Sequence, residues 1–284
     1  MASLQLQNPS FETPLVLAPE AATALGTKTI DLSQAGLDGA FSVTLPSDFT
    51  PFLVEGVPGW EIFDPAGVIT GEAKPLPNAQ DIEAASEIGV VNSTVTSFKP
   101  VSNNPARDGE NSLYVFSAEQ PGTASAFGVR QVLDSVLLPS TQYELNVSVG
   151  NPDFENPNEL PPDPLFPFPV DPSSPLEGFP GYRVELLAGD SLLAFDENSQ
   201  TIEEGIFERI SLSYLSSAEE VGLGERLEVR LLSPVSGIGA EVHFDNASIT
   251  ATAVPEGIPV VGFAIAFGGL LTYRRIRRWS HRFV

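Results

Sequence analysis

The chain has no cysteine among its 284 residues, few basic side chains and only two histidines. Without cysteine it can form neither a disulfide framework nor a thiolate metal site, and it has no thiol nucleophile. Fourteen Lys and Arg stand against 37 Asp and Glu, which gives a formal net charge of −23. Because so acidic a surface repels phosphate backbones, the composition excludes nucleic acid as a partner and favours the binding of cations.

Helical periodicity is also scarce before residue 255, where residues 81–88 are the one stretch that suggests it. Alternation with a period of two is frequent instead, as in Tyr143, Leu145, Val147 and Val149, which are separated by polar residues. Glycine and proline punctuate these runs, which is typical of hairpin turns. We therefore expect an all-β protein, an antiparallel β-sandwich over residues 1–253.

Two segments interrupt this pattern and are expected to be long loops, at about residues 15–52 and 151–181. The first has no clear period, and the second is rich in proline and in carboxylates, which oppose regular ladder pairing. No internal repeat is present. One domain with two long loops is therefore expected, rather than two domains.

The last 31 residues, 254–284, have a different composition from the rest. The dipeptide Pro255-Glu256 is followed by an apolar run over residues 258–273 and then by an arginine cluster, formed by Arg274, Arg275, Arg277 and Arg278. An apolar segment that ends in arginines is what a membrane stop requires. The run is somewhat shorter than the roughly 20 residues of a full span, and we expect a single apolar helix there.

This layout resembles the PEP-CTERM sorting signal of Gram-negative bacteria. The resemblance implies that Pro255 and Glu256 mark the site recognised by an exosortase-like processing enzyme, and that the protein reaches the cell surface or an extracellular polysaccharide matrix. Gly257 stands where the family has a second proline, which leaves open whether the tail is cut or retained as a membrane anchor. The first seven residues have no signal-peptide character. We therefore expect a leader upstream of Met1, or else an internal fragment of a larger product.

A second resemblance covers most of the region before the tail. It is carried by four segments in order: Asn8-Pro9-Ser10-Phe11-Glu12, Val57-Pro58-Gly59-Trp60, Gly109-Glu110-Asn111-Ser112-Leu113 and Val242-His243-Phe244-Asp245-Asn246-Ala247-Ser248-Ile249. Together they resemble a galactose-binding-like jelly roll, the fold of many carbohydrate-binding modules. The long acidic, proline-rich loop and the size of the region depart from that family.

The jelly-roll resemblance implies a structural Ca2+ held by Glu12 and Asp245, with backbone carbonyls completing the shell. The alternative is that both are ordinary surface carboxylates. It also implies sugar stacking on an exposed aromatic ring, for which Trp60 and Tyr182 are the candidates, although aromatic residues in a sandwich usually belong to the core.

Catalytic residues are hard to find in this sequence. His243 and Asp245 would point to the same face of a strand, but no serine in a nucleophile-elbow context accompanies them. A solvent-facing pair is the expected arrangement. We therefore expect a non-enzymatic surface protein that binds polysaccharide. The alternatives are a purely structural acidic matrix protein, or a surface glycosidase that uses two of its many carboxylates.

Overall fold

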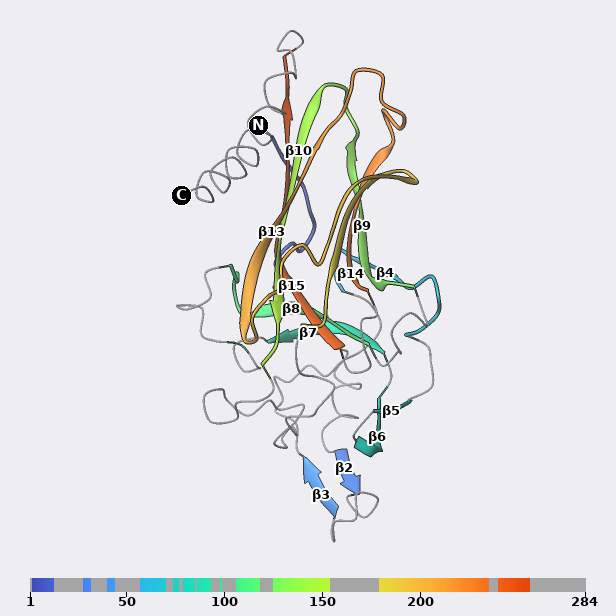
Figure 1. Cartoon of the computed structure of the whole chain (residues 1–284), viewed down its shortest axis with the longest axis vertical. Coiled ribbons are helices and arrows are strands. Elements are labelled where there is room, and N and C mark those ends of the chain that lie inside the picture. The colour runs from blue at the N-terminus through green and yellow to red at the C-terminus, as the bar shows by residue number, and fades with distance from the viewer. Residues whose placement is uncertain are drawn as a thin grey trace, which may run out of the picture.

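The structure is a computed structural model of the whole chain. The residues it describes are 2–12, 28–31, 40–43, 57–69, 74–76, 79–84, 86–92, 98, 106–117, 125–153, 179–234 and 240–255. Every regular element within these residues is a β-strand, and the two large sheets are antiparallel (Figure 1). The expectation of an all-β antiparallel protein is therefore confirmed.

The larger sheet contains six strands. Its order is β13 (Ile206–Leu215), β10 (Thr141–Asn151), β15 (Ala240–Ala253), β8 (Asn111–Ser117) and β7 (Glu87–Asn92), and β1 (Ala2–Leu4) pairs with the far end of β15. β15 is thus central: it pairs with β10, β8 and β1.

The second sheet contains five strands, in the order β12 (Ser191–Glu197), β11 (Arg183–Ala188), β14 (Arg226–Ser233), β9 (Phe127–Val136) and β4 (Glu61–Phe63). Two small pairs, β2 (Lys28–Asp31) with β3 (Ala40–Val43) and β5 (Lys74–Leu76) with β6 (Ala79–Ala84), lie at one end of the molecule in Figure 1. Residues 81–88 are strand and not helix, since β6 and β7 include most of them.

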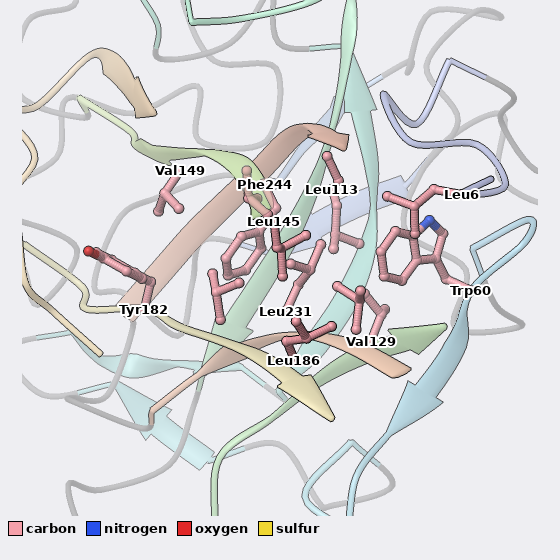
Figure 2. Close-up of a cluster of buried hydrophobic side chains, with 14 of the residues drawn as sticks. Leu6, Trp60, Leu113, Val129, Leu145, Val149, Tyr182, Leu186, Leu231 and Phe244 are labelled. Carbon is pink, nitrogen blue, oxygen red and sulfur yellow. The ribbon is translucent and has the colours of Figure 1, made fainter. Parts of the chain in front are cut away.

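The core lies between the two large sheets and follows the alternation of the sequence. Tyr143, Leu145, Val147 and Val149 of β10 are all buried in it, as the period of two predicts. The five-stranded sheet contributes the corresponding residues of β14 and β11, such as Leu231 and Leu186 (Figure 2).

A β-bulge changes the phase of β15 halfway along its length. Asn146 of β10 pairs with Ser248 and Ser148 pairs with Asp245, so β15 has one residue more than its partner between these points. Asn246 in the bulge has a φ of 46°, and the amide of Ala247 donates to the carbonyl of Pro9 at 2.9 Å. The extra residue also changes which positions along the strand face the core.

Ion pairs cover the outer face of the five-stranded sheet. Glu185 is 8% exposed at its side chain and accepts from Arg183 at 2.6 Å and from Arg230 at 3.3 Å. The guanidinium of Arg230 also lies over the ring of Phe63, 4.3 Å from the ring centroid. This face is therefore polar, with each charge opposed by its neighbour.

Candidate functional site

A row of five residues crosses the outer face of the six-stranded sheet, one from each of its main strands. The register pairs Phe207 (β13) with Gly150 (β10), Gly150 with His243 (β15), His243 with Tyr114 (β8), and Tyr114 with Gly89 (β7). The only histidine of the described residues thus stands in the middle of the sheet, with glycine and aromatic positions on either side.

His243 is hydrogen-bonded through both ring nitrogens. Nδ1 lies 2.9 Å from the hydroxyl of Ser112, and Nε2 lies 2.6 Å from Oε1 of Glu241. The three side chains are almost fully buried, at 0% exposure for Ser112, 1% for His243 and 9% for Glu241. They form a continuous hydrogen-bonded chain from a hydroxyl to a carboxylate, which we call the Ser112–His243–Glu241 relay.

The alternation of β15 explains why these groups share a face. Val242 and Phe244 belong to the core, so Glu241, His243 and Asp245 project from the opposite face. The prediction that His243 and Asp245 share one face agrees with the structure. The expectation that they face solvent was wrong, because both side chains are buried, at 1% and 0% exposure.

Aromatic rings cover the relay. Phe98, which belongs to no strand, has its ring 4.8 Å from the imidazole of His243 in an edge-on arrangement and 4.5 Å from the ring of Phe207. The rings of Tyr114 and Phe207 lie 6.2 Å and 6.4 Å from the imidazole. A hydrogen-bonded relay among aromatic rings is shielded from water, which strengthens its electrostatic interactions.

The relay can hold a proton in more than one place. When His243 is neutral with its proton on Nε2, it donates to Glu241 and its Nδ1 accepts from the hydroxyl of Ser112. When both nitrogens are protonated, the same hydroxyl becomes the acceptor. A serine hydroxyl serves in either role, so both states are hydrogen-bonded without any strand moving.

Glu12 and Asp245 meet at one loop, residues 106–110, which leads into β8. Oε1 of Glu12 accepts from the amides of Glu110 and Asn111, each at 2.8 Å, and Oδ2 of Asp245 accepts from the amide of Asp108 at 2.7 Å. A Cβ atom at Gly109 would come within 2.2 Å of the Glu12 carboxylate. The sequence resemblance therefore chose two carboxylates that the fold brings to the same place.

Burial, together with the nearby carboxylates of Asp108 and Glu12, raises the pKa of Asp245 to about 7, against two backbone hydrogen bonds that lower it. Arg107, 5% exposed, is the neighbouring cation. Its Nη2 donates to the carbonyl of Glu110 at 3.1 Å, and its Nε is buried with no hydrogen-bond partner among the described residues. Within the described residues, Arg107 thus stands beside three carboxylates, those of Asp245, Glu12 and Glu110.

Metal binding at this loop would need ligands beyond these side chains. Within the described part of the chain, no three or more His, Asp or Glu side chains gather in a group that could hold a metal ion. The two carboxylates do have the donor chemistry for a hard cation, which takes carboxylate and carbonyl oxygens.

Trp60 and Tyr182, expected to stack on sugars, are core side chains. Trp60 is 5% exposed, lies 5.6 Å from the ring of Phe11 and donates through Nε1 to the carbonyl of Asn8. Tyr182 is 0% exposed and stands at the other end of the core in Figure 2. Neither ring presents a face on which a sugar could stack.

Most of the expected sorting signal falls outside the described residues. Pro255 is exposed just after β15. Glu256, the apolar run over residues 258–273 and the four arginines Arg274, Arg275, Arg277 and Arg278 all lie beyond the described part, as do most of the loops at 15–52 and 151–181. In the portion that is described, no helix is long and apolar enough to cross a membrane.

Sequence reasoning did not find Ser112 or Glu241 as site residues. A signal for Glu241 was present, because it stands two residues from His243 on an alternating strand and so shares its face. Ser112 had no comparable signal, since it joins His243 only through the pairing of β8 with β15, across 131 positions of sequence.

Comparison with known proteins gives consistent results. The model of the HpiC1-like family, described as HpiC1 cyclase, matches residues 2–250. A cyclase from Fischerella sp. TAU, crystallised in complex with 4-(1H-indol-3-yl)butan-2-one, is 29% identical with a TM-score of 0.59, over 90% of this chain and 100% of that one. The Stig cyclase Fisc from the same organism, in complex with (3Z)-3-(1-methyl-2-pyrrolidinylidene)-3H-indole, is 28% identical with a TM-score of 0.60, over 89% and 98%. No curated protein sequence matches.

These matches overturn the function expected from the sequence. The identification with PEP-CTERM proteins was wrong, and so were the non-enzymatic role, the carbohydrate-binding function and the exosortase, polysaccharide and membrane partners. The order of polar, apolar and basic residues in the tail carries no information about the chemistry of the domain before it, so it could not indicate the function. The four jelly-roll segments likewise describe strand ends and turns, which proteins with different functions share.

Proposed function

Since the chain belongs to the HpiC1-like cyclase family, we propose that it is an enzyme that closes a ring in a small-molecule substrate. The Ser112–His243–Glu241 relay would move the proton for this reaction. The observation that carries the proposal is the relay itself, a buried hydroxyl–imidazole–carboxylate chain among aromatic rings.

Acid-triggered ring closure needs one group that both gives and takes back a proton. The proton adds to the substrate and creates an electron-poor carbon, a nucleophilic carbon of the same molecule bonds to it, and a proton then leaves. The relay would end as it began, with no change in the net formula. Positioned proton transfer of this kind contributes about 10²–10⁴-fold to the rate.

The aromatic rings support an aromatic, largely apolar substrate. Both crystallised relatives hold indole compounds with a substituent at ring position 3. We extend this to the present chain and propose a 3-substituted indole as the substrate. Rings such as those of Phe98, Tyr114 and Phe207 can pack against an indole edge to face. They also exclude water, which would otherwise capture an electron-poor intermediate.

A Ca2+ ion at Glu12 and Asp245 is part of the proposal. The burial of Asp245 beside the carboxylates of Glu12 and Asp108 supports it, because a cation there would favour the ionised form that burial disfavours. The ion would supply positive charge to hold these carboxylates together. Two residues would link the ion to the relay. Glu12 accepts from the amide of Asn111, where β8 begins, one residue before Ser112. Asp245 follows His243 by two positions on β15. The site would thus align the two strands that carry the relay.

We also propose that residues 1–253 form one domain with the jelly-roll arrangement of strands. The family match over residues 2–250 supports this boundary. Localisation at the cell surface or outside the cell stays a prediction.

Ring closure can be tested with the protein and a panel of indoles that bear an unsaturated chain at position 3. In deuterium oxide, the product should be an isomer of the substrate apart from one incorporated deuterium, separable by chromatography and identified by mass. Binding of 4-(1H-indol-3-yl)butan-2-one is measured by calorimetry alongside.

Glu241→Gln should reduce the ring-closure rate by about 10²–10⁴-fold, because the amide still accepts from Nε2 but cannot take a proton. Affinity for the indole ketone should change little. Glu144→Gln is the matched control, since Glu144 is exposed on β10 of the same sheet, and it should keep the wild-type rate. Full activity in the Glu241 variant would refute the role of the relay, and a wild-type protein that neither binds nor converts any indole would refute the substrate class.

A further inference from the structure

Two glycines in the row across the six-stranded sheet stand directly beside the aromatic residues of the site. Gly150 lies between Phe207 and His243, and Gly89 pairs with Tyr114 on the other side. A Cβ atom at position 150 would lie 2.6 Å from Cε1 of Phe207, and one at position 89 would lie 2.6 Å from Cε1 of Tyr114. Each ring therefore rests where a side chain would otherwise be.

The backbone does not require glycine at either position. Neither Gly89 nor Gly150 is among the residues with a positive φ, and both lie within regular strands, where glycine weakens the ladder because it has no side chain to pack. Gly128 offers a contrast in the other sheet, since its Cβ would meet the backbone oxygen of Leu231 at 2.1 Å. Glycine at 128 is needed by the sheet itself, whereas at 89 and 150 it makes room for a ring.

We propose that Gly89 and Gly150 are positioning residues that let the rings of Tyr114 and Phe207 lie down on the sheet on either side of His243, and that they thereby select the substrate pose and the product. This inference rests on the function proposed above. The two rings would form the walls of the site, and their height above the sheet would fix how deeply a flat substrate sits beside the relay.

Product choice is sensitive to such small displacements. An open-chain substrate can fold in several ways before its ring closes, and each folded form gives a different ring size or stereoisomer. A methyl group at position 150 must push the Phe207 ring away from the sheet, because real Cβ atoms do not approach within 3 Å of other heavy atoms. A misplacement of about 1 Å at a reacting centre changes rates by up to about 100-fold, which is enough to exchange one product for another.

The test is a double-mutant cycle on Gly150 and Phe207, with binding of 4-(1H-indol-3-yl)butan-2-one and the ratio of ring-closed products as readouts. Gly150→Ala alone should weaken ketone binding by about tenfold and change the product ratio, by displacing the ring. Phe207→Leu removes the ring that the new methyl group would strike. In that background, Gly150→Ala should therefore have almost no further effect on either readout.

Val149→Ala is the matched control, because Val149 is the neighbour of Gly150 and faces the core. It should lower the melting temperature and leave the product ratio as in the wild type. If Gly150→Ala alone does not fold, the Gly150→Ala/Phe207→Leu double variant, in which the overlap is relieved, still gives the comparison with Phe207→Leu.

The outcomes separate this inference from the proposed function. An equal effect of Gly150→Ala in both backgrounds, or an unchanged product ratio in the single variant, would overturn the role of the glycine while ring closure by the wild type still stood. Wild-type protein that neither binds the ketone nor closes a ring would overturn the proposed function itself, and product selection with it.

Discussion

Replacement of Asp245 by Asn should change how the stability of the protein depends on pH. The carboxyl is fully buried beside Glu12 and Asp108, and its pKa is about 7 in the folded protein against 3.8 for the ordinary group. Between these two values the unfolded chain has released this proton while the folded protein retains it. Stability in the absence of divalent cations should therefore fall as the pH rises from about 4 to about 7.

The size of the effect follows from the difference in pKa. About three pKa units at 1.36 kcal/mol each give a loss of about 4 kcal/mol of unfolding free energy across this range. For a chain of this length, that amounts to about 10 °C in melting temperature. The Asp245→Asn variant lacks the titrating group and should lose about 4 kcal/mol less than the wild type over the same range.

Urea unfolding in EDTA at several pH values from 4 to 8, for the wild type and Asp245→Asn, measures this difference. The amide of the variant cannot accept from both Asp108 and Asn246 as the carboxylate does. This lost hydrogen bond lowers the unfolding free energy of the variant by the same amount at every pH. The test is therefore the slope of unfolding free energy against pH. Added Ca2+ should restore wild-type stability at pH 7–8 by binding the ionised carboxylate, and should have little effect on the variant. Equal slopes for both proteins in EDTA would refute the reasoning.

Two further predictions concern the relay and the ion pairs of the other sheet. Ser112→Ala removes the hydroxyl that serves both protonation states of His243, so the ring-closure kcat should fall about tenfold with little change in KM, and Ser112→Thr should recover part of it. Retained activity in the alanine variant would show that the hydroxyl is not used. Glu185→Ala removes the carboxylate that Arg183 and Arg230 share, but Arg183 keeps Glu197 and Arg230 keeps Glu228, so the change should cost about 1.5 kcal/mol in urea unfolding. A loss that vanishes in high salt would mean that solvent already screens these charges.

Local sequence pattern was enough to predict the all-β class and the core face of β10, and it placed one pair of site residues. It did not predict β2 and β3, which lie within the expected loop at 15–52, or β6, which lies in the one stretch that suggested a helix. The alternation in β10 gave its core face because burial between two sheets repeats every second residue. The sequence motifs around Glu12 and Asp245 predicted that these two residues lie close together, and both bind the loop at 106–110. Turns at strand ends depend on local chemistry, which a motif records. The relay could not be predicted in the same way, because Ser112 reaches His243 only across two paired strands, and two of the rings beside His243 come from β13 and from residue 98.

The bulge in β15 reverses which residues of this strand face the core, the even-numbered or the odd-numbered ones. Before it, the even-numbered Val242 and Phe244 face the core, and after it the odd-numbered Ala247 and Ile249 do. If the second parity ran through the whole strand, Glu241, His243 and Asp245 would point into the hydrocarbon interior. Because of this one inserted residue, the outer face of the six-stranded sheet carries Glu241, His243 and Asp245. Deletion of a single residue at the bulge would exchange inside for outside along half a strand, so the length of β15 is as much a part of the active site as the identity of any side chain on it.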